Sequence, residues 1–156
     1  MSQNQWTAVD RYISDLFAPS DPVLEAALHD SAQAELPTIQ VTPGQGKLLA
    51  ILAQTIAART ILEIGTLGAY STIWLGRALP PDGKLVTLEV NPKHAEVARR
   101  NLERAGLTNV VELRLGPALD TLKQLAADGA LQPQRQPRRE PLPAAGPYHP
   151  LPAREY

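Results

Sequence analysis

Residues 60–89 read TILEIGTLGAYSTIWLGRALPPDGKLVTLE, and this stretch decides the fold. A short β-branched run at 60–64 predicts a strand, a helical pattern follows over 70–79, and the turn PPDG precedes a second strand at 84–89. Strand, helix and strand at this spacing predict a right-handed crossover between two parallel strands.

The same alternation continues toward the C-terminus. Asn91-Pro92 begins a helix with alanine and leucine on its inner side, and Gly106 ends it as a left-handed cap. Residues 109–115 predict a third strand, and residues 118–127 predict a further helix. The pattern therefore predicts an α/β fold with a parallel sheet, in which ligands bind beyond the carboxyl ends of the strands.

Three helices are expected before the first strand. Apolar residues at helical spacing between 6 and 17 mark the first, and Ser20-Asp21-Pro22 supplies a cap for a second that runs to about residue 36. A third helix begins at Thr42-Pro43 and places four apolar residues on one side: Leu48, Leu49, Leu52 and Ile56.

Composition narrows the class of protein. The chain has 156 residues, 44% of them hydrophobic, and a formal net charge of −1. The first 130 residues carry 11 Lys and Arg against 14 Asp and Glu, so the basic surface of a nucleic-acid-binding protein is missing. No cysteine is present for a disulfide or a thiolate metal site. No segment predicts a signal peptide or membrane span, and we expect a cytoplasmic protein.

The sequence changes character near residue 130. The last 26 residues hold 7 of the 15 prolines and contain no Val, Ile or Phe. Such a segment buries too little apolar surface to offset its ordering entropy. We therefore expect two regions, an α/β domain over 1–130 and a proline-rich, disordered tail over 131–156.

Small residues follow the first predicted strand. Gly65 and Gly68 permit a sharp turn and let a ligand approach the backbone, while the next helix directs unpaired N–H groups toward an anionic group. The spacing is not G-x-G-x-x-G, so the dinucleotide-binding fingerprint is not met. An ordinary tight turn between strand and helix is the alternative.

Two acidic residues end the first two predicted strands. Glu63 lies in an apolar strand, where a carboxylate needs a donor from a ligand amine or, alternatively, from a distant segment or water. Glu89 can accept two hydrogen bonds from a ribose diol, and its alternative role is a solvated acid that caps the next helix. Glu89 therefore predicts a nucleoside ligand, without indicating which nucleoside, and Glu63 predicts a donor such as a ligand amine.

A family resemblance rests on residues 41–107, from VTPGQGK to NLERAGL, and on 110–125, VVELRLGPALDTLKQL. These segments resemble the cofactor half of the cation-dependent S-adenosylmethionine O-methyltransferases of the catechol and caffeoyl-CoA type. The resemblance implies an incomplete Rossmann-like class I methyltransferase fold, with about three parallel strands in the order 3-2-1 after the N-terminal helices. It implies S-adenosylmethionine as cofactor and a small catechol-like hydroxyl acceptor as substrate.

The resemblance also implies roles for particular residues. Those expected to contact the methionine part are Val41, Glu63, Gly65, Thr66 and Ser71. Of these, the Glu63 carboxylate would meet the cofactor amine and the Ser71 hydroxyl would meet its carboxylate. Glu89 would hold the ribose hydroxyls, and Ala118 would lie against the adenine.

The chain departs from the family pattern after residue 130. Family members place an apolar strand there, followed by a metal-binding aspartate and a lysine suited to act as base. Here the stretch reads RREPLP, which cannot form a central strand because proline donates no ladder hydrogen bond. The resemblance implies Mg²⁺, yet its ligands are missing, and His29, His94 and His149 are single surface or loop histidines by this interpretation. We expect a truncated or frame-shifted member with impaired catalysis.

The sequence is also compatible with other functions. The chain could be a pseudo-enzyme that binds S-adenosylmethionine or oligomerises without catalysis, or a nicotinamide-dependent oxidoreductase. With three strands, one side of the strand at 60–64 is an unpaired apolar edge, which favours low stability and a homodimer or aggregation.

Overall fold

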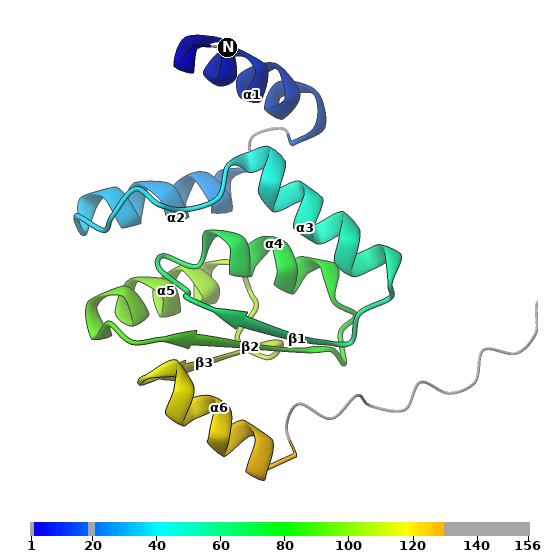
Figure 1. The fold of residues 1–156 in the computed structure, drawn as a ribbon, viewed down its shortest axis with the longest axis vertical. Helices are drawn as coiled ribbons and strands as arrows, with labels where there is room; N and C mark the ends of the chain where they lie inside the picture. Colours follow the sequence, from blue (N-terminus) through cyan, green and yellow to red (C-terminus); the bar gives the residue numbers. More distant parts are fainter. Residues whose placement is uncertain (1, 19–20, 130–156) are drawn as a thin grey trace, which may run out of the picture.

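The computed structural model describes residues 2–18 and 21–129 (Figure 1). The tail expected over 131–156 lies outside the described residues, so its disorder and the domain boundary stay predictions. The sheet has three parallel strands in the order β1-β2-β3, formed by β1 (Thr60–Ile64), β2 (Lys84–Glu89) and β3 (Val111–Leu115). The predicted α/β class, parallel sheet and strand order are confirmed.

Strand register brings the two acidic residues to one edge. Glu63 of β1 pairs with Thr87 of β2, and Glu89 of β2 pairs with Leu115 of β3. The third strand begins at Val111, two residues later than predicted, because a turn holds the preceding residues: the Val110 N–H donates to the Leu107 carbonyl over 3.0 Å. The strands therefore end together beside the loops that follow them.

Helices cover both faces of the sheet. Figure 1 shows α4 (Tyr70–Ala78) and α5 (Pro92–Arg104) on one face and α6 (Ala118–Ala127) on the other. Leu85 of β2 packs into the core with α4 and α5, whereas Val86 and Leu88 pack with Leu125 of α6. Burial on both faces explains the apolar run of β2, which is typical of a central parallel strand.

The three N-terminal helices are α1 (Gln3–Phe17), α2 (Pro22–Gln33) and α3 (Pro43–Thr55). Side chains cap each of them, as Ser2 and Thr42 form capping boxes and Asp21 accepts from two backbone N–H groups. Helix α2 ends before the predicted residue 36 because Glu35 adopts a φ of 52°.

The buried side of α3 differs from its largest apolar face. Leu48, Leu52 and Ile56 are exposed, and the buried positions are Gly46, Ala50 and Ala53. The indole of Trp74 on α4 lies so close to Gly46 that a Cβ there would collide with it. Small residues therefore face α4 because the two helices approach closely. No helix among the described residues is long and apolar enough to cross a membrane.

Candidate functional site

The loop between β1 and α4 has an unusual backbone. Gly65, Leu67 and Ala69 adopt φ values of 91°, 51° and 68°, so left-handed conformations alternate along five residues. This conformation costs a non-glycine residue about 1–2 kcal/mol, and surrounding contacts must supply that energy. A Cβ built at Gly65 would meet no atom within 4 Å, so the loop leaves open space on that side.

Glu89 supplies contacts that hold this loop. Its Oε2 accepts from the backbone N–H groups of Thr66 (3.2 Å) and Leu67 (2.8 Å), and its Oε1 accepts from those of Val90 and Asn91 (2.9 Å each). The side chain of Asn91, not Glu89, caps α5. Glu89 is only 6% exposed, so the alternative of a solvated helix-capping acid is wrong.

Opposing effects set the pKa of Glu89. Burial raises the pKa of this carboxyl, but the backbone N–H groups of Asn91, Leu67 and Val90 more than offset burial and hold the pKa below its usual value. His94 adds a smaller effect in the same direction, with its Nδ1 3.6 Å from Oε1. Glu89 is therefore an anion at neutral pH.

Three hydroxyl groups surround the Glu63 carboxylate. Ser71 donates to Oε1 over 2.6 Å, while Thr72 (2.6 Å) and Thr87 (2.7 Å) both donate to Oε2. Hydroxyl groups of α4 and β2, rather than a ligand amine, therefore supply three of the donors that the Glu63 carboxylate needs. A carboxylate has about four acceptor positions, so one position on Oε1 is left. Glu63 can still accept one hydrogen bond from a ligand.

The N-terminus of α4 lies next to Glu63. Ala69 precedes the helix in a left-handed conformation, and no side chain caps the first turn. Uncapped N–H groups and the helix dipole favour an anionic group at this end. A cationic and an anionic ligand group can therefore bind side by side here, one at Glu63 and one at the helix end.

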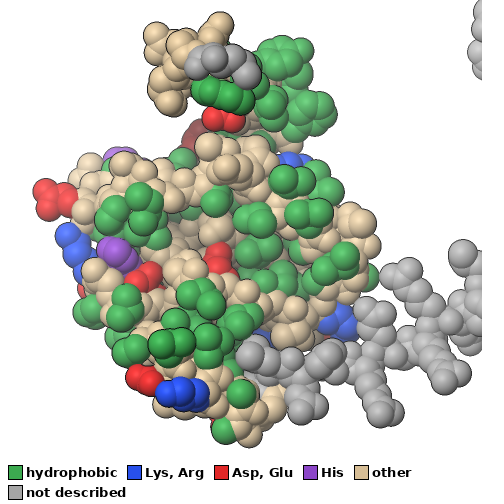
Figure 2. Space-filling view, in the orientation of Figure 1, with side chains coloured by type: hydrophobic (Ala, Val, Ile, Leu, Met, Phe, Trp, Pro, Cys, Tyr) green, Lys and Arg blue, Asp and Glu red, His purple; other side chains and the backbone are tan. Residues whose placement is uncertain are grey.

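A cavity of about 620 Å³ opens at these groups. Six of the seven residues singled out from the sequence line it: Val41, Glu63, Gly65, Thr66, Ser71 and Glu89. Figure 2 shows acidic side chains within the hollowed centre of this face, bordered by hydrophobic ones. The volume lies in the range of small-molecule and cofactor sites. Ala118 does not line the cavity and packs on the α6 side near Val86 and Leu88.

The sequence interpretation missed His94. It was expected to be a surface or loop residue, but it belongs to the first turn of α5, has a side chain 17% exposed and lines the cavity. A single histidine has no spacing pattern that would mark it as a site residue. The one indication in the sequence is its place in the first turn of a helix that follows a strand ending in an acidic residue. His29 is exposed on α2, as expected, and His149 lies outside the described residues.

The described residues do not fit a metal ion. Between residues 2 and 129, apart from the two positions left out, no three His, Asp or Glu side chains lie together as a possible metal site.

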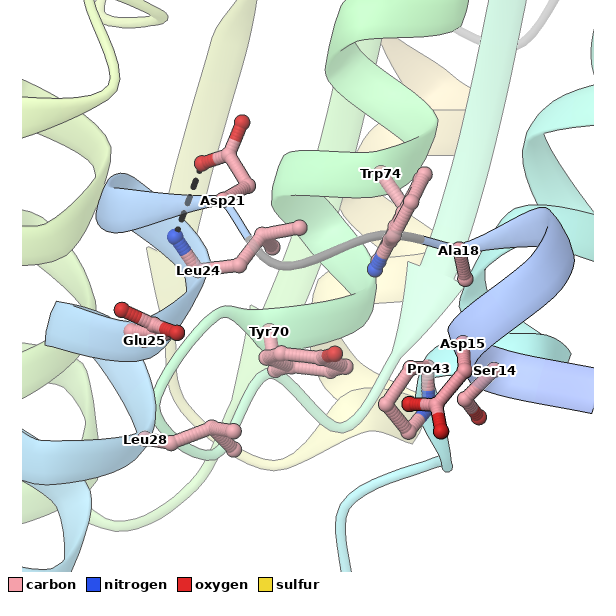
Figure 3. Close-up of a pocket in the computed structure, with 10 residues that line it drawn as sticks. All are labelled: Ser14, Asp15, Ala18, Asp21, Leu24, Glu25, Leu28, Pro43, Tyr70 and Trp74. Carbon is pink, nitrogen blue, oxygen red and sulfur yellow. Dashed lines mark hydrogen bonds between the residues drawn. The ribbon is translucent and has the colours of Figure 1, made fainter. Parts of the chain in front are cut away.

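A second cavity of about 400 Å³ lies between α1, α2 and α4 (Figure 3). Tyr70 and Trp74 of α4 line it together with Leu24 and Leu28 of α2. The Trp74 Nε1 is buried and has no hydrogen-bond partner among the described residues. Asp21 at its rim is occupied by the cap of α2 and by Arg77. None of the seven residues that the sequence predicts to bind the cofactor lines this cavity.

Comparison with known proteins decides the family. A family model described as O-methyltransferase matches residues 15–134, which is most of the chain. The chain belongs to the S-adenosylmethionine-dependent O-methyltransferase family. This family is the catechol and caffeoyl-CoA type that the sequence resembles, so that prediction is confirmed.

Individual O-methyltransferases agree with this assignment. The chain is 52% identical over 130 residues to a catechol O-methyltransferase of Niastella koreensis, covering 83% of this chain and 59% of that protein. It is 57% identical over 118 residues to one of Mycobacterium tuberculosis, covering 76% and 54%. An O-methyltransferase structure from Bacillus cereus in complex with SAH superposes with a TM-score of 0.78 at 54% identity, covering 80% and 56%. The chain thus spans little more than half the length of these O-methyltransferases.

Proposed function

We propose that the cavity beside β1 and β2 binds S-adenosylmethionine, and that the protein takes part in methyl transfer to a hydroxyl of a small, catechol-like acceptor. The proposal rests on one observation. Glu63 and Glu89, two carboxylates with separate sets of donors, line the same cavity at the carboxyl edge of the sheet. The related Bacillus cereus structure holds SAH, the product of methyl transfer.

Glu63 and α4 would hold the amino-acid end of the cofactor. The remaining acceptor position on Glu63 Oε1 suits the α-ammonium group. Because the Ser71 hydroxyl already donates its one proton to Glu63, the cofactor carboxylate would be bound by backbone N–H groups in the first turn of α4. Val41, Gly65 and Thr66 complete the wall around this end.

Glu89 and His94 would meet the nucleoside end. All four acceptor positions of Glu89 are occupied by backbone N–H groups, so ribose hydroxyls must share its oxygens with them. The proposed contact between Ala118 and the adenine rests on the family resemblance alone. When bound, S-adenosylmethionine supplies an electrophilic methyl group on its sulfonium.

Binding is better supported than catalysis. Glu89 has a lowered pKa and is therefore a weak base, and Glu63 is occupied by three hydroxyl donors. Both carboxylates are arranged for holding a ligand rather than for removing a proton from an acceptor. A chain that binds S-adenosylmethionine without turnover is therefore the second candidate function.

Calorimetry on the 156-residue chain tests binding. We expect SAH to bind, and we expect Glu63→Gln to weaken it about tenfold to a hundredfold, because a charge-assisted hydrogen bond contributes about 1.5–3 kcal/mol. Glu112→Gln is the matched control, since Glu112 pairs with Lys84 and Arg114 and does not line the cavity. No SAH binding by well-folded protein, equal losses in the two variants, or tighter binding of NADH than of SAH would contradict the proposal.

A turnover assay separates the two candidates. The chain is incubated with S-adenosylmethionine and a panel of catechols, with and without Mg²⁺, and methylated product is measured. Product supports methyl transfer. Binding with no product on any catechol supports the binding protein instead.

A further inference from the structure

A chain of hydrogen bonds inside the protein joins the two carboxylates. The Thr66 N–H donates to Glu89, the hydroxyls of Thr66 and Thr87 lie 2.7 Å apart, and the Thr87 hydroxyl donates to Glu63 over 2.7 Å. Both threonines are buried, with Thr87 fully so. The chain thus runs from the nucleoside end of the cavity to its amino-acid end.

Only one proton arrangement satisfies this chain. A hydroxyl has one proton, and Thr87 uses its proton on the anionic Glu63, which accepts hydrogen bonds and donates none. Thr87 must then be the acceptor in its contact with Thr66, so the Thr66 hydroxyl donates to it. The direction of every bond from Thr66 to Glu63 is therefore fixed.

Thr87 cannot touch a ligand itself. It lies in the middle of the sheet, fully buried, and it does not line the cavity. Its neighbours on the same side of β2 are the core residue Leu85 and the buried Glu89, and among the described residues its hydroxyl is one of two donors on Glu63 Oε2. Those two donors leave the single acceptor position on Oε1, beside Ser71, where both residues line the cavity.

We infer that Thr87 is a positioning residue, which orients Glu63 so that its unoccupied acceptor position faces the amino-acid end of the cofactor, with Thr66 fixing the direction of the Thr87 hydroxyl. The inference rests on the proposed function. Loop 65–69 supplies Thr66 and is itself held by Glu89, so a ligand that orders the loop at the nucleoside end also orders Glu63.

Two ligands distinguish positioning from a general structural role. SAH has both ends, whereas adenosine lacks the amino-acid end and does not reach Glu63. Thr87→Val keeps the side-chain shape and removes the hydroxyl. We expect this variant to bind SAH about tenfold more weakly and adenosine within about twofold of the unmodified chain. Thr87→Ser restores the hydroxyl and is expected to restore SAH binding to within about threefold.

Two further variants keep the test decisive. Ile73→Val is the matched control, because Ile73 is fully buried on α4 beside Thr72 and carries no hydroxyl; it should leave the ratio of SAH to adenosine affinity unchanged. Thr66→Val keeps the Thr87 hydroxyl but removes the donor that fixes its direction. This variant should weaken SAH binding about threefold more than it weakens adenosine binding, and it serves if Thr87→Val does not fold.

Each outcome has a distinct meaning. Selective loss of SAH affinity in Thr87→Val, recovered by Thr87→Ser, supports the inference. Unchanged SAH binding, or equal loss of SAH and adenosine binding, overturns it and leaves the proposed function standing. No SAH binding by the unmodified chain overturns the proposed function, and the inference with it.

Discussion

Asn101 of α5 donates a hydrogen bond of 2.9 Å from its side-chain amide to the backbone carbonyl of Gly68, 33 residues earlier in the chain. Asn101 is fully buried, and its own Oδ1 accepts from Arg104 over 2.7 Å. A Cβ built at Gly68 would collide with the side chain of Ser31 on α2. Helices α2 and α5 therefore clamp the loop that borders the cavity.

Removing this hydrogen bond should destabilise the fold. Asn101→Ala leaves the Gly68 carbonyl buried without its donor, and we expect a loss of about 1–3 kcal/mol in the free energy of unfolding. Urea denaturation measures this change. Asn109→Ala, at an exposed turn position, should change stability by less than about 0.5 kcal/mol. Equal effects from the two substitutions would show that the clamp contributes nothing.

Glu89→Gln tests the second support of the loop. A glutamine amide has one oxygen, so about two of the four backbone N–H groups lose their acceptor, which should cost about 2–3 kcal/mol at pH 7. Because the pKa of Glu89 is lowered in the folded state, its carboxylate stabilises the fold above the ordinary carboxyl pKa, and that contribution is lost as the pH falls through the folded pKa.

The acid dependence is measured as a difference between two proteins. Urea denaturation of the unmodified chain and of Glu89→Gln at several pH values should give stability curves that approach each other as the pH falls below the ordinary carboxyl pKa and through the lowered pKa of Glu89. Other carboxylates titrate in both proteins and cancel in the difference. A gap that stays constant from pH 7 into acid would contradict the role assigned to the Glu89 anion.

Much of the fold follows from local sequence. The strands at 60–64 and 84–89 were predicted with the bounds that the structure has, because β-branched runs end at glycine or proline punctuation. The buried face of α3 was not predictable from hydrophobic spacing. Its position against α4 depends on the close approach of Trp74 to Gly46, which only the tertiary structure reveals.

The candidate site, like the fold, could be predicted only in part from the sequence. Glu63 and Glu89 could be found because an acid at the end of an apolar strand needs a partner. The partners themselves could not be found, since Ser71, Thr72 and Thr87 meet Glu63 only when β2 and α4 pack against β1. His94 was missed for the same reason, as its place at the cavity depends on how α5 packs.

Asp21 combines two roles that substitution can separate. It caps α2 through the N–H groups of Val23 and Leu24, and it binds Arg77 of α4 through both oxygens. The Arg77 guanidinium is the main cause that lowers the pKa of Asp21, against the raising effect of burial. Asp21→Asn keeps a capping oxygen and should cost at most about 1 kcal/mol, whereas Asp21→Ala should cost about 1–2 kcal/mol.

NMR titration checks the electrostatic part of this prediction. In Arg77→Ala, the pKa of Asp21 should move up toward its ordinary value. An unchanged pKa in that variant, or equal costs for the Asn and Ala substitutions at position 21, would mean that the contact with α4 does not act as described.

The residues that follow α3 and α5 share a left-handed backbone conformation, but one is alanine and the other glycine. Exchanging these residue types should therefore change the stability in opposite directions. Ala57 follows α3 with a φ of 50°, and Gly106 follows α5 with a φ of 68°. Each is followed by a residue that donates back across the helix end, from Ala58 to Ala53 and from Leu107 to Leu102. Ala57→Gly should stabilise by about 0.5–1 kcal/mol and Gly106→Ala should destabilise by about 1 kcal/mol.

Thermal unfolding gives a direct comparison of the two variants. A Cβ at Gly106 would meet no atom within 4 Å, so its cost comes from the backbone conformation alone. We expect the midpoints to move in opposite directions by several degrees. If both midpoints move in the same direction, the left-handed backbone conformation does not determine the effect of these two substitutions on stability.

We expect the unpaired edge of β1 to promote association between copies of this chain. Within the described residues, β1 pairs with β2 alone. The backbones of Arg59 and Gly65 bond to β2, so alternate residues between them direct their N–H groups toward the unpaired side. Ile64 on this strand is 62% exposed. An apolar edge with unpaired backbone groups is a template for a second copy of the chain.

Sedimentation velocity over a range of concentrations measures this association. We expect the unmodified chain to form dimers or larger species as its concentration rises, and Ile64→Lys to shift the equilibrium toward monomer, because a charged side chain on an edge strand disfavours pairing. Val90→Lys is the control: Val90 is similarly exposed but lies in the loop after β2, away from the edge. If the chain stays monomeric at every concentration, it does not self-associate and the prediction is wrong. If both substitutions change the association equally, the contact lies outside the edge of β1.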